Sequence, residues 1–278
     1  MQRGILALVA VGVGGVWLSL AGLVAAADKC PSGSVRSGTI CMDRYEASVW
    51  DLTEVSAAAK KKLVDRIREG RVDEADLLAV GAIQRGVSGD DYGAGCPDTG
   101  NGCVDFYAVA IPGVTPSQFL TWFQAAAAAR NSWKRLPTNA EWQAAAFGTP
   151  DPGSSAVGSE DCNTANAGGA GVHAAVPTGS RSNCVSDVEA FDMVGNVWEW
   201  VADWVPLSPA GCPSAWTPMG TFSSDDFMCL SGAETTTGPG ALIRGGSYGN
   251  FESAGVFAVV GQFIPSRSEP GVGFRAAR

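Results

Sequence analysis

The stretch from Asp192 to Trp204 constrains this chain more than any other part of its sequence. It reads Asp-Met-Val-Gly-Asn-Val-Trp-Glu-Trp-Val-Ala-Asp-Trp, so three tryptophans stand among three carboxylates. Indole rings at this density are too apolar for a loop left in water, and we expect them to be buried with each N–H paired. A carboxylate beside them then needs a cation or several hydrogen-bond donors, because an unpaired charge in a dry site costs on the order of several kcal/mol.

A turn inside this stretch could bring the carboxylates together. Gly195 and Asn196 permit a tight turn, so Asp192, Glu199 and the backbone carbonyls between them could face one point. Calcium prefers several oxygen ligands that include carboxylates, and the residues therefore predict a calcium site. An arrangement in which Asp192 and Glu199 only accept hydrogen bonds from backbone N–H groups fits these residues equally well.

The N-terminus has the pattern of a secretory signal. Arg3 is followed by an apolar run that ends in small residues at Ala27, and this order predicts a signal peptide over 1–27 with cleavage after Ala27. The apolar run is also long enough to be retained as a membrane anchor, which is the alternative. We therefore expect a protein that is secreted, periplasmic or held at the cell surface.

Eight cysteines, all beyond the signal, indicate an oxidising compartment. They form four neighbouring couples along the chain, and each disulfide would add about 2–4 kcal/mol of stability if unstrained. A zinc site is the competing interpretation, although no couple has the two-residue spacing that zinc favours. The simplest pairing is Cys30–Cys41, Cys96–Cys103, Cys162–Cys184 and Cys212–Cys229.

Size and charge limit the remaining possibilities. About 250 residues follow the signal, which suits one large domain or two small ones. The formal net charge is −9, and about −10 without Arg3, so a nucleic-acid surface is disfavoured. The one histidine, His173, lies in a glycine-rich loop, so neither a Ser-His-Asp triad nor a multi-histidine metal centre is supported.

Two helices are predicted early in the chain. Apolar residues recur at four-residue steps from Val55 to Ile67 and predict an amphipathic helix over about 53–69, which Gly70 ends. A short helix follows from Asp73, as the N-cap, to about Val80.

Two further helices carry capping boxes, in which a Thr side chain and a later Gln or Glu satisfy the first backbone N–H groups. One is predicted to begin at Thr115, with Gln118 closing the box, and to run to about Arg130. The other begins at Thr138 with Glu141. The long segments between elements are rich in turn-forming residues and read as loops, which indicates an α+β fold with little regular sheet. Strands are predicted at 38–49, 106–111, 241–248, 254–260 and 271–277.

Four motifs occur in order along the second half of the chain: Arg-Leu-Pro-Thr-Asn-Ala-Glu-Trp at 135–142, Asp-Met-Val-Gly-Asn-Val-Trp-Glu-Trp at 192–200, Arg-Gly-Gly-Ser-Tyr at 244–248 and Gly-Phe-Arg at 273–275. Together they resemble the formylglycine-generating enzyme, or sulfatase-modifying factor, family. The resemblance extends from about Cys41 to the C-terminus.

This resemblance implies a C-type-lectin-like fold with two main helices, a small twisted sheet and long ordered loops. The domain would cover 28–278, with a helical insertion at about 53–80. The resemblance also implies a calcium site in which the side chains of Asp192 and Glu199 are joined by the carbonyls of Gly195 and Val197.

The oxidase chemistry of the family is not implied. Its enzymes bind copper through two cysteines placed just after the Gly-Gly-Ser-Tyr turn, because a soft thiolate pair suits Cu(I). No cysteine follows Cys229 in this chain, and one histidine cannot supply the histidine cluster of the related iron-dependent branch. We therefore predict no copper and expect no sulfatase substrate.

The tail from 245 to 275 is similar to the variable segment of proteins targeted by diversity-generating retroelements, which share this fold. In such segments a fixed framework, here 254–258, 265–266 and 273–275, alternates with positions that are free to change. Aromatic and arginine side chains displayed together are typical of a binding hot spot. The alternative is that Phe251 and Phe263 belong to the core. The positions expected to point outward are Tyr248, Asn250, Phe251, Val260, Gln262, Phe263, Arg267 and Glu269.

The sequence thus predicts a secreted, calcium-stabilised, disulfide-bonded protein that binds a protein or cell-surface ligand through this tail without catalysis. The runner-up is an oxidoreductase of the same family with altered, non-copper chemistry, in which Glu199, Asp203 or Ser247 acts near a Trp-rich cleft. A structural envelope module is the third possibility. No feature of the sequence indicates an oligomeric state.

Overall fold

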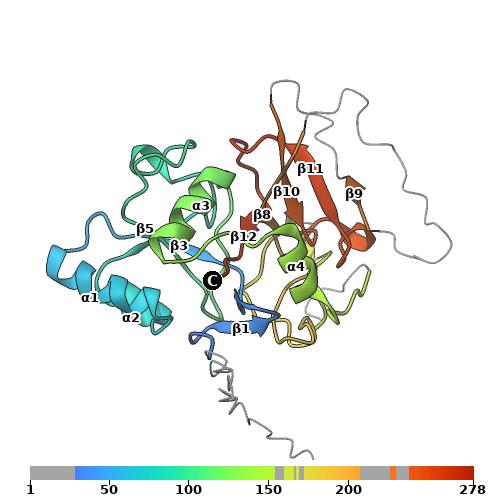
Figure 1. Ribbon diagram of the computed structural model, residues 1–278, viewed down its shortest axis with the longest axis horizontal. Coiled ribbons are helices and arrows are strands. Elements are labelled where there is room, and N and C mark those ends of the chain that lie inside the picture. The colour runs from blue at the N-terminus through green and yellow to red at the C-terminus, as the bar shows by residue number, and fades with distance from the viewer. Residues whose placement is uncertain (1–28, 154–159, 166, 169–171, 207–225, 230–237) are drawn as a thin grey trace, which may run out of the picture.

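The computed structural model describes residues 29–153, 160–165, 167–168, 172–206, 226–229 and 238–278 (Figure 1). The predicted signal at 1–27 lies outside these ranges. Across the described ranges, none of the helices combines the length and the apolar character needed to cross a membrane.

The centre of the fold is a five-stranded sheet in which the tryptophan-rich stretch supplies a strand, β8. β8 pairs antiparallel with β10 and parallel with β12, so the C-terminal end of the chain lies beside it. The sequence predicted the turn that precedes β8 but not the strand. The order across the sheet is β12 (Val272–Phe274), β8 (Trp198–Val205), β10 (Gly240–Arg244), β11 (Val259–Phe263) and β9 (Met228–Cys229).

Two helices pack on opposite faces of this sheet. Side chains of a strand alternate between faces, and along β8 Trp200 points to one core cluster while Val201 points to the other. α3 (Trp122–Asn131) shares the first cluster and α4 (Asn139–Ala146) the second. A run of alanines keeps α3 slim, and four of its buried residues are alanines: Ala125, Ala127, Ala128 and Ala129.

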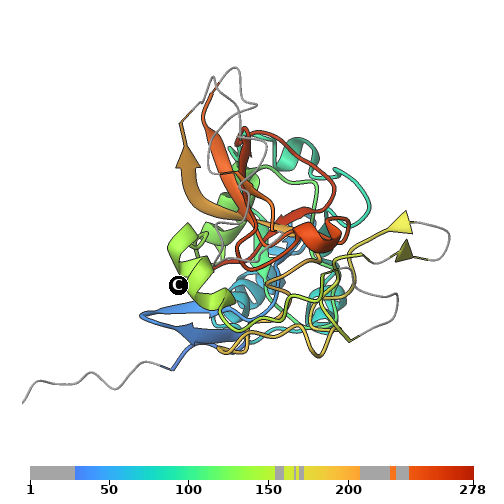
Figure 2. The same cartoon turned by 90° about the vertical axis from the view of Figure 1, so that its right-hand side faces the viewer.

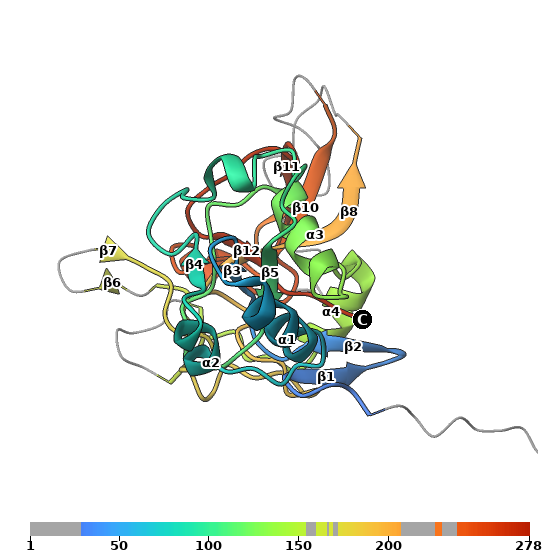
Figure 3. The same ribbon diagram turned by 90° about the vertical axis from the view of Figure 1, so that its left-hand side faces the viewer.

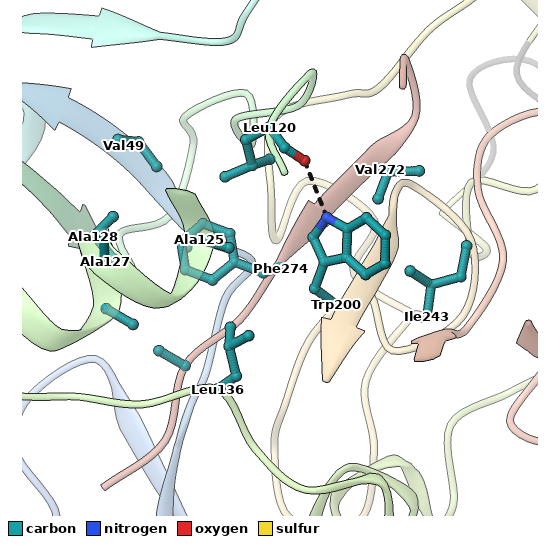
Figure 4. Packing of buried hydrophobic residues seen from close by; sticks show 14 of the residues in the cluster. Val49, Leu120, Ala125, Ala127, Ala128, Leu136, Trp200, Ile243, Val272 and Phe274 are labelled. Atoms are coloured by element: carbon teal, nitrogen blue, oxygen red, sulfur yellow. Dashed lines mark hydrogen bonds between the residues drawn. The ribbon is translucent and has the colours of Figure 1, made fainter. Parts of the chain in front are cut away.

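Trp200 is the largest fully buried side chain in the cluster beneath α3. It is 1% exposed, and its indole N–H donates to the Leu120 carbonyl oxygen at 3.1 Å. Figure 4 shows the ring between the sheet and the chain that leads into α3. Burying an aromatic ring of this size while pairing its N–H satisfies both parts of the side chain, which agrees with the sequence prediction.

A second sheet and the two early helices form a separate layer. β3 (Ser48–Asp51) lies between β4 (Ile83–Arg85) and β5 (Phe106–Val109), all antiparallel. α1 (Ala57–Arg68) and α2 (Glu74–Ala79) cover this sheet and share a core cluster with it, and Figure 3 shows them facing the viewer in front of β3 and β5.

Short hairpins and turns complete the described chain. β1 (Ser34–Ser37) pairs with β2 (Ile40–Asp43), and β6 (Ala167–Gly168) pairs with β7 (Val172–His173). The β6–β7 hairpin projects from the body of the molecule in Figure 2. Two single 3₁₀ turns, η1 (Gly93–Gly95) and η2 (Phe251–Ser253), lie in the loops.

Two of the predicted helix caps are confirmed by the structure and one is not. Thr138 accepts from the Glu141 N–H and forms the predicted capping box of α4, and Asp73 caps α2 as predicted. The predicted start at Thr115 is wrong: α3 begins after Thr121, whose capping box is closed by Gln124.

The reason for that error lies in the segment before α3. Ser117 accepts from the Val49 N–H at 2.7 Å, and the Gln118 side chain accepts from the Gly271 N–H at 2.8 Å. Phe119 then adopts a left-handed backbone with φ of 54°, which a helix does not allow. Tertiary hydrogen bonds therefore hold this segment out of the helix despite its local signal.

Two strand predictions also change. The predicted strand at 38–49 is split into β2 and β3. The predicted strand at 254–260 begins only at Val259, because η2 and the turn after it occupy the preceding residues. The remaining predicted strands, at 106–111, 241–248 and 271–277, contain β5, most of β10 and β12.

Three of the four predicted disulfides are present. Cys30–Cys41, Cys96–Cys103 and Cys162–Cys184 close loops with sequence separations of 11, 7 and 22. Cys229 is also disulfide-bonded, but Cys212, its predicted partner, lies outside the described residues. Disulfides of this number are typical of a protein that folds in an oxidising compartment.

Candidate functional site

The turn before β8 depends on three left-handed residues. Asp192, Gly195 and Asn196 have φ angles of 57°, 76° and 56°. Asp, Asn and Gly tolerate this conformation best, which explains their placement here. A Cβ on Gly195 would stand 2.4 Å from the Asn163 carbonyl oxygen, so the turn also packs tightly against that loop.

Asp192 is buried, with a side chain that is only half satisfied. Its Oδ2 accepts from the Thr178 hydroxyl at 2.9 Å and from the Gly179 N–H at 2.7 Å. Its Oδ1 is buried with no hydrogen-bond partner in the described part of the chain. Burial raises the pKa of Asp192 from 3.8 to about 6, against the opposing effect of these two hydrogen bonds.

Glu199 forms a buried ion pair with Arg275. The guanidinium donates to both Glu199 oxygens, with the closest contact at 2.6 Å, and the two side chains are 1% and 0% exposed. The Trp142 indole N–H donates to Oε2 at 2.6 Å. Arg275 therefore supplies the positive charge that a carboxylate among buried indoles requires, and α4, β8 and the C-terminal segment are joined at one point.

Glu46 is the member of this group that the sequence did not reveal. Its Oε1 accepts from the Val197 N–H at 3.1 Å, and its Oε2 accepts from the Asn196 side-chain amide. Burial, with the nearby charges of Asp192 and Glu199, holds the pKa of Glu46 well above its usual 4.5. The available signal was a carboxylate directly before the apolar strand that begins at Ser48.

Three buried carboxylates thus face one buried arginine. If all of Glu46, Asp192 and Glu199 were ionised, one guanidinium would leave two negative charges without a counter-charge. Such a site favours either bound protons or a bound cation, because uncompensated charge in a dry interior is costly.

The fit of these residues to calcium is partial. Asp192 Oδ1 is suited to a cation, since it is buried and has no hydrogen-bond partner in the described ranges. Glu199 offers no comparable atom, because Arg275 and Trp142 engage both its oxygens. Among the residues described, no three His, Cys, Asp or Glu side chains are arranged to hold a metal ion. A cation here would depend on Asp192 and on backbone carbonyls such as those predicted at Gly195 and Val197, and calcium stays a prediction.

The two polar residues of the alternative, catalytic prediction have structural partners. Asp203 accepts from the Asn139 N–H at 2.6 Å, at the first residue of α4. Ser247 donates to the Asn250 side-chain oxygen at 2.7 Å and closes the turn after β10.

The predicted contact positions of the tail are mostly accessible. Phe251 is 41% exposed, and Arg267 is exposed with its guanidinium stacked over the Phe263 ring at 4.8 Å. Val260 is a correction: it is 3% exposed, because it points from β11 into the core cluster beneath α3. The partly exposed positions are Tyr248, Asn250, Gln262, Phe263 and Glu269.

Most positions of the predicted framework are buried, as expected. Ala254, Ala258 and Phe274 are each 0% exposed, as is Arg275. Phe257 departs from the prediction, because 37% of it is exposed although it lies inside the predicted framework. Apart from Phe257, Ser266 and the partly exposed Val256, the predicted framework is buried, and larger side chains of the tail reach the surface from it.

Trp204 extends the exposed aromatic surface beyond the tail, and the sequence prediction that it is buried is wrong. Ala241 of β10 pairs with Trp204 on one side and Phe263 on the other, so both rings flank it on one face of the sheet. Trp204 is 42% exposed and packs edge-on against Trp122 at 5.1 Å. The sequence carried no signal for this exposure, because β8 itself was not predicted.

Comparison with known proteins identifies the family to which the sequence motifs point. The family model for the sulfatase-modifying factor enzyme 1-like domain matches residues 23–278. The hercynine oxygenase of Mycolicibacterium smegmatis is 33% identical over 143 residues, which are 48% of this chain and 33% of that protein. The hercynine oxygenase of Mycobacterium tuberculosis is 31% identical over 140 residues, 48% of this chain and 32% of that protein. This chain therefore matches about a third of the length of these curated relatives.

Solved structures with a similar arrangement have low sequence identity. The Major Tropism Determinant I1 variant has a TM-score of 0.45 and 17% identity, covering 89% of this chain and 52% of that chain. PvdO from Pseudomonas aeruginosa has a TM-score of 0.42 and 19% identity, covering 86% of this chain and 80% of that chain.

Proposed function

Since this chain belongs to the family of the sulfatase-modifying factor enzyme 1-like domain, we propose that it is a non-catalytic member that binds a protein or cell-surface ligand. The contact surface is the C-terminal patch, which we define as Tyr248, Asn250, Phe251, Gln262, Phe263, Arg267 and Glu269. We propose further that 1–27 direct secretion and that 28–278 form one domain with an insertion at 53–80.

The observation that carries this proposal is the exposure of large side chains on a rigid frame. Phe251 and Arg267 are exposed, and Phe263 reaches the surface beneath Arg267, while Ala254 and Ala258 are fully buried. Aromatic and arginine side chains are enriched among the few residues that carry most of the binding energy at protein interfaces. A patch of this kind is therefore suited to protein recognition.

Peptide selection tests the position of the contact surface. Random peptides displayed on phage would be selected against the whole protein, and their binding measured on Phe263→Ala and Arg267→Ala. Truncation of a hot-spot side chain typically costs about 2 kcal/mol or more, or at least about thirtyfold in affinity. Phe147→Ala is the matched control, because that ring is 71% exposed and lies after α4 rather than in the patch. Selected peptides that depend on Phe147 and not on Phe263 would contradict the proposal.

We also propose that calcium stabilises the buried carboxylate group. A cation held by Asp192 Oδ1 would offset the charge that one arginine leaves uncompensated. Calcium at about a hundred times its Kd would stabilise the fold by about 2.7 kcal/mol, and chelation would remove that contribution. Asp192→Asn should melt at the same temperature with calcium or chelator. An unchanged melting temperature of the unmodified protein on chelation would mean that Asp192 only accepts hydrogen bonds.

The alternative function is an oxidoreductase, which the identity to two hercynine oxygenases favours. Oxygen uptake by the purified protein would be followed with hercynine or a thiol peptide, after loading with iron or with copper. We expect no uptake above that of the free metal. Turnover that requires the folded protein would replace the binding proposal.

A further inference from the structure

A basic hollow lies along α1, apart from the C-terminal patch. It is open to solvent, with a volume of about 530 Å³, between α1 and β5. Val55, Ala57 and Val64 form apolar walls, and Tyr107, which is 6% exposed, lines the hollow from β5. Figure 1 shows α1 on the opposite side of the molecule from β11, so this hollow is separate from the tail.

The charges at its rim are mainly positive. Lys60, Lys61 and Arg68 line the hollow together with one acid, Asp65. Lys60 is paired with Asp105 at 2.9 Å, whereas Lys61 and Arg68 make no ion pair among the residues that the structure describes. A chain with a net charge of −9 thus presents two cations, neither in an ion pair with a described residue, at the edge of a hollow with apolar walls.

Trp133 stands beside Arg68 in an unusual conformation. Its φ is 57°, the left-handed region that Gly and Asn favour, and its ring is 66% exposed. The Arg68 guanidinium lies 4.5 Å from the centre of the ring, and its Nε donates to the Asn131 carbonyl oxygen at 3.1 Å. Folding gains little from a strained and exposed indole, and strain of this kind is concentrated at sites of function.

From these contacts we propose that the hollow binds an acidic peptide segment of a partner protein. One apolar side chain of the segment enters between Val55 and Val64, and carboxylates on either side of it bind Lys61 and Arg68. These two residues are about 10 Å apart along the helix axis. In an extended peptide each residue spans about 3.3 Å and alternate side chains share one face. Carboxylates four residues apart therefore lie about 13 Å apart on the same face as the residue midway between them, which the long side chains of Lys61 and Arg68 can reach.

The shape and lining of the hollow favour a peptide over two other polyanions. An acidic polysaccharide has no apolar group to fill the space between Val55, Val64 and Tyr107. A membrane surface is too broad to enter a hollow of this size. Recognition of acidic motifs by clustered cations is a recurrent mode of peptide binding.

Fluorescence anisotropy with the whole protein tests this proposal. The probe is a labelled peptide with two glutamates four residues apart and a leucine midway between them, so that all three side chains share one face of the extended peptide. We expect binding that weakens as salt rises, and about tenfold weaker binding when glutamine replaces the glutamates or alanine replaces the leucine. Heparin and vesicles of anionic phospholipid serve as the competing polyanions.

Three variants locate the binding. Lys61→Gln combined with Arg68→Gln should weaken peptide binding by about tenfold or more. Trp133→Asn should also weaken it, because the ring positions the Arg68 guanidinium by stacking. It should not lower the melting temperature, because Asn accepts the left-handed backbone. Lys62→Gln is the matched control, since Lys62 is exposed on the same helix and does not line the hollow, and it should change affinity by less than about twofold.

Two results would overturn the proposal. The first is peptide binding that is unchanged in the Lys61→Gln/Arg68→Gln variant. The second is binding of heparin or vesicles through these same residues with no dependence on the leucine of the peptide, which would mark a general polyanion surface.

Discussion

Removal of Arg275 should be among the most damaging single changes in this protein. Arg275→Met replaces the aliphatic stem of the arginine by an apolar side chain of similar shape and removes the guanidinium. Glu199 is then buried without its counter-charge. The guanidinium also donates to the Phe191 carbonyl oxygen at 2.7 Å and to the Asp43 carbonyl oxygen at 3.1 Å, so these acceptors lose a partner as well.

The expected magnitude follows from the burial of the pair. Breaking a buried ion pair by removing one member costs about 3–5 kcal/mol. A domain of this size loses about 2–4 °C of melting temperature per kcal/mol, which gives a fall of about 6–20 °C. Arg267→Met is the matched control in the same tail: that arginine pairs with Glu269 at the surface, with side chains 48% and 33% exposed, and its loss should change stability by less than about 1 kcal/mol.

Thermal and urea unfolding of four proteins would measure this directly. They are the unmodified protein, Arg275→Met, Glu199→Gln and the double variant. If the two side chains stabilise the fold by pairing, the double variant should be less damaged than the sum of the singles by about 1–3 kcal/mol. Additive effects, or a loss below about 1 kcal/mol for Arg275→Met, would refute the view that Arg275 balances Glu199.

Three other predictions concern the same framework. In chelator, the pKa of Asp192 is raised from 3.8 in the unfolded chain to about 6 in the folded one, so its stabilising contribution is complete below pH 4 and is lost as pH rises through 6. Between pH 4 and 7, urea unfolding should therefore show the unmodified protein losing on the order of 3 kcal/mol relative to Asp192→Asn, and parallel curves would contradict this. Gly195→Ala places a Cβ 2.4 Å from the Asn163 carbonyl oxygen and should cost about 2 kcal/mol or more, whereas Gly249→Ala, with nothing within 4 Å, should cost less than about 0.5 kcal/mol in the same assay. Replacing Cys162 and Cys184 by serine opens a loop with a sequence separation of 22 and should lower the unfolding free energy by about 3 kcal/mol, and an unchanged melting temperature would show that the loop is held by its other contacts.

Local signals in the sequence were reliable where one motif decides one structure. Thr138 with Glu141 set the start of α4, Asp73 set the start of α2, and neighbouring cysteines set the described disulfides. Each of these features depends on residues that are close together in the chain, so no knowledge of the tertiary fold was needed.

Where two sequence patterns each predicted a helix start, the sequence alone could not decide between them. Thr115 and Thr121 both begin a Thr-x-x-Gln pattern, and the choice between them depends on Ser117 and Gln118, which bond to distant parts of the chain. The strand character of β8 was hidden for a similar reason, because its aromatic density drew attention to the turn before it.

The candidate site was predictable only in part. The sequence placed Asp192 and Glu199 around one buried turn. It did not reveal Arg275 as the partner of Glu199 or Glu46 as a third carboxylate, since these lie 76 and 150 residues or more from their partners. The predictions of side-chain exposure were wrong for a similar reason. Val260 was expected to be exposed and is buried, and Trp204 was expected to be buried and is exposed, because the face that each one occupies depends on the register between strands.

Hydrogen–deuterium exchange of the protein with and without a peptide selected against it tests the proposed contact surface most directly. We predict that exchange slows at 248–251 and 262–269 and stays unchanged along α4 and the β1–β2 hairpin. Protection confined to other segments, with no change at 248–251 or 262–269, would contradict the conclusion that the tail is the recognition surface.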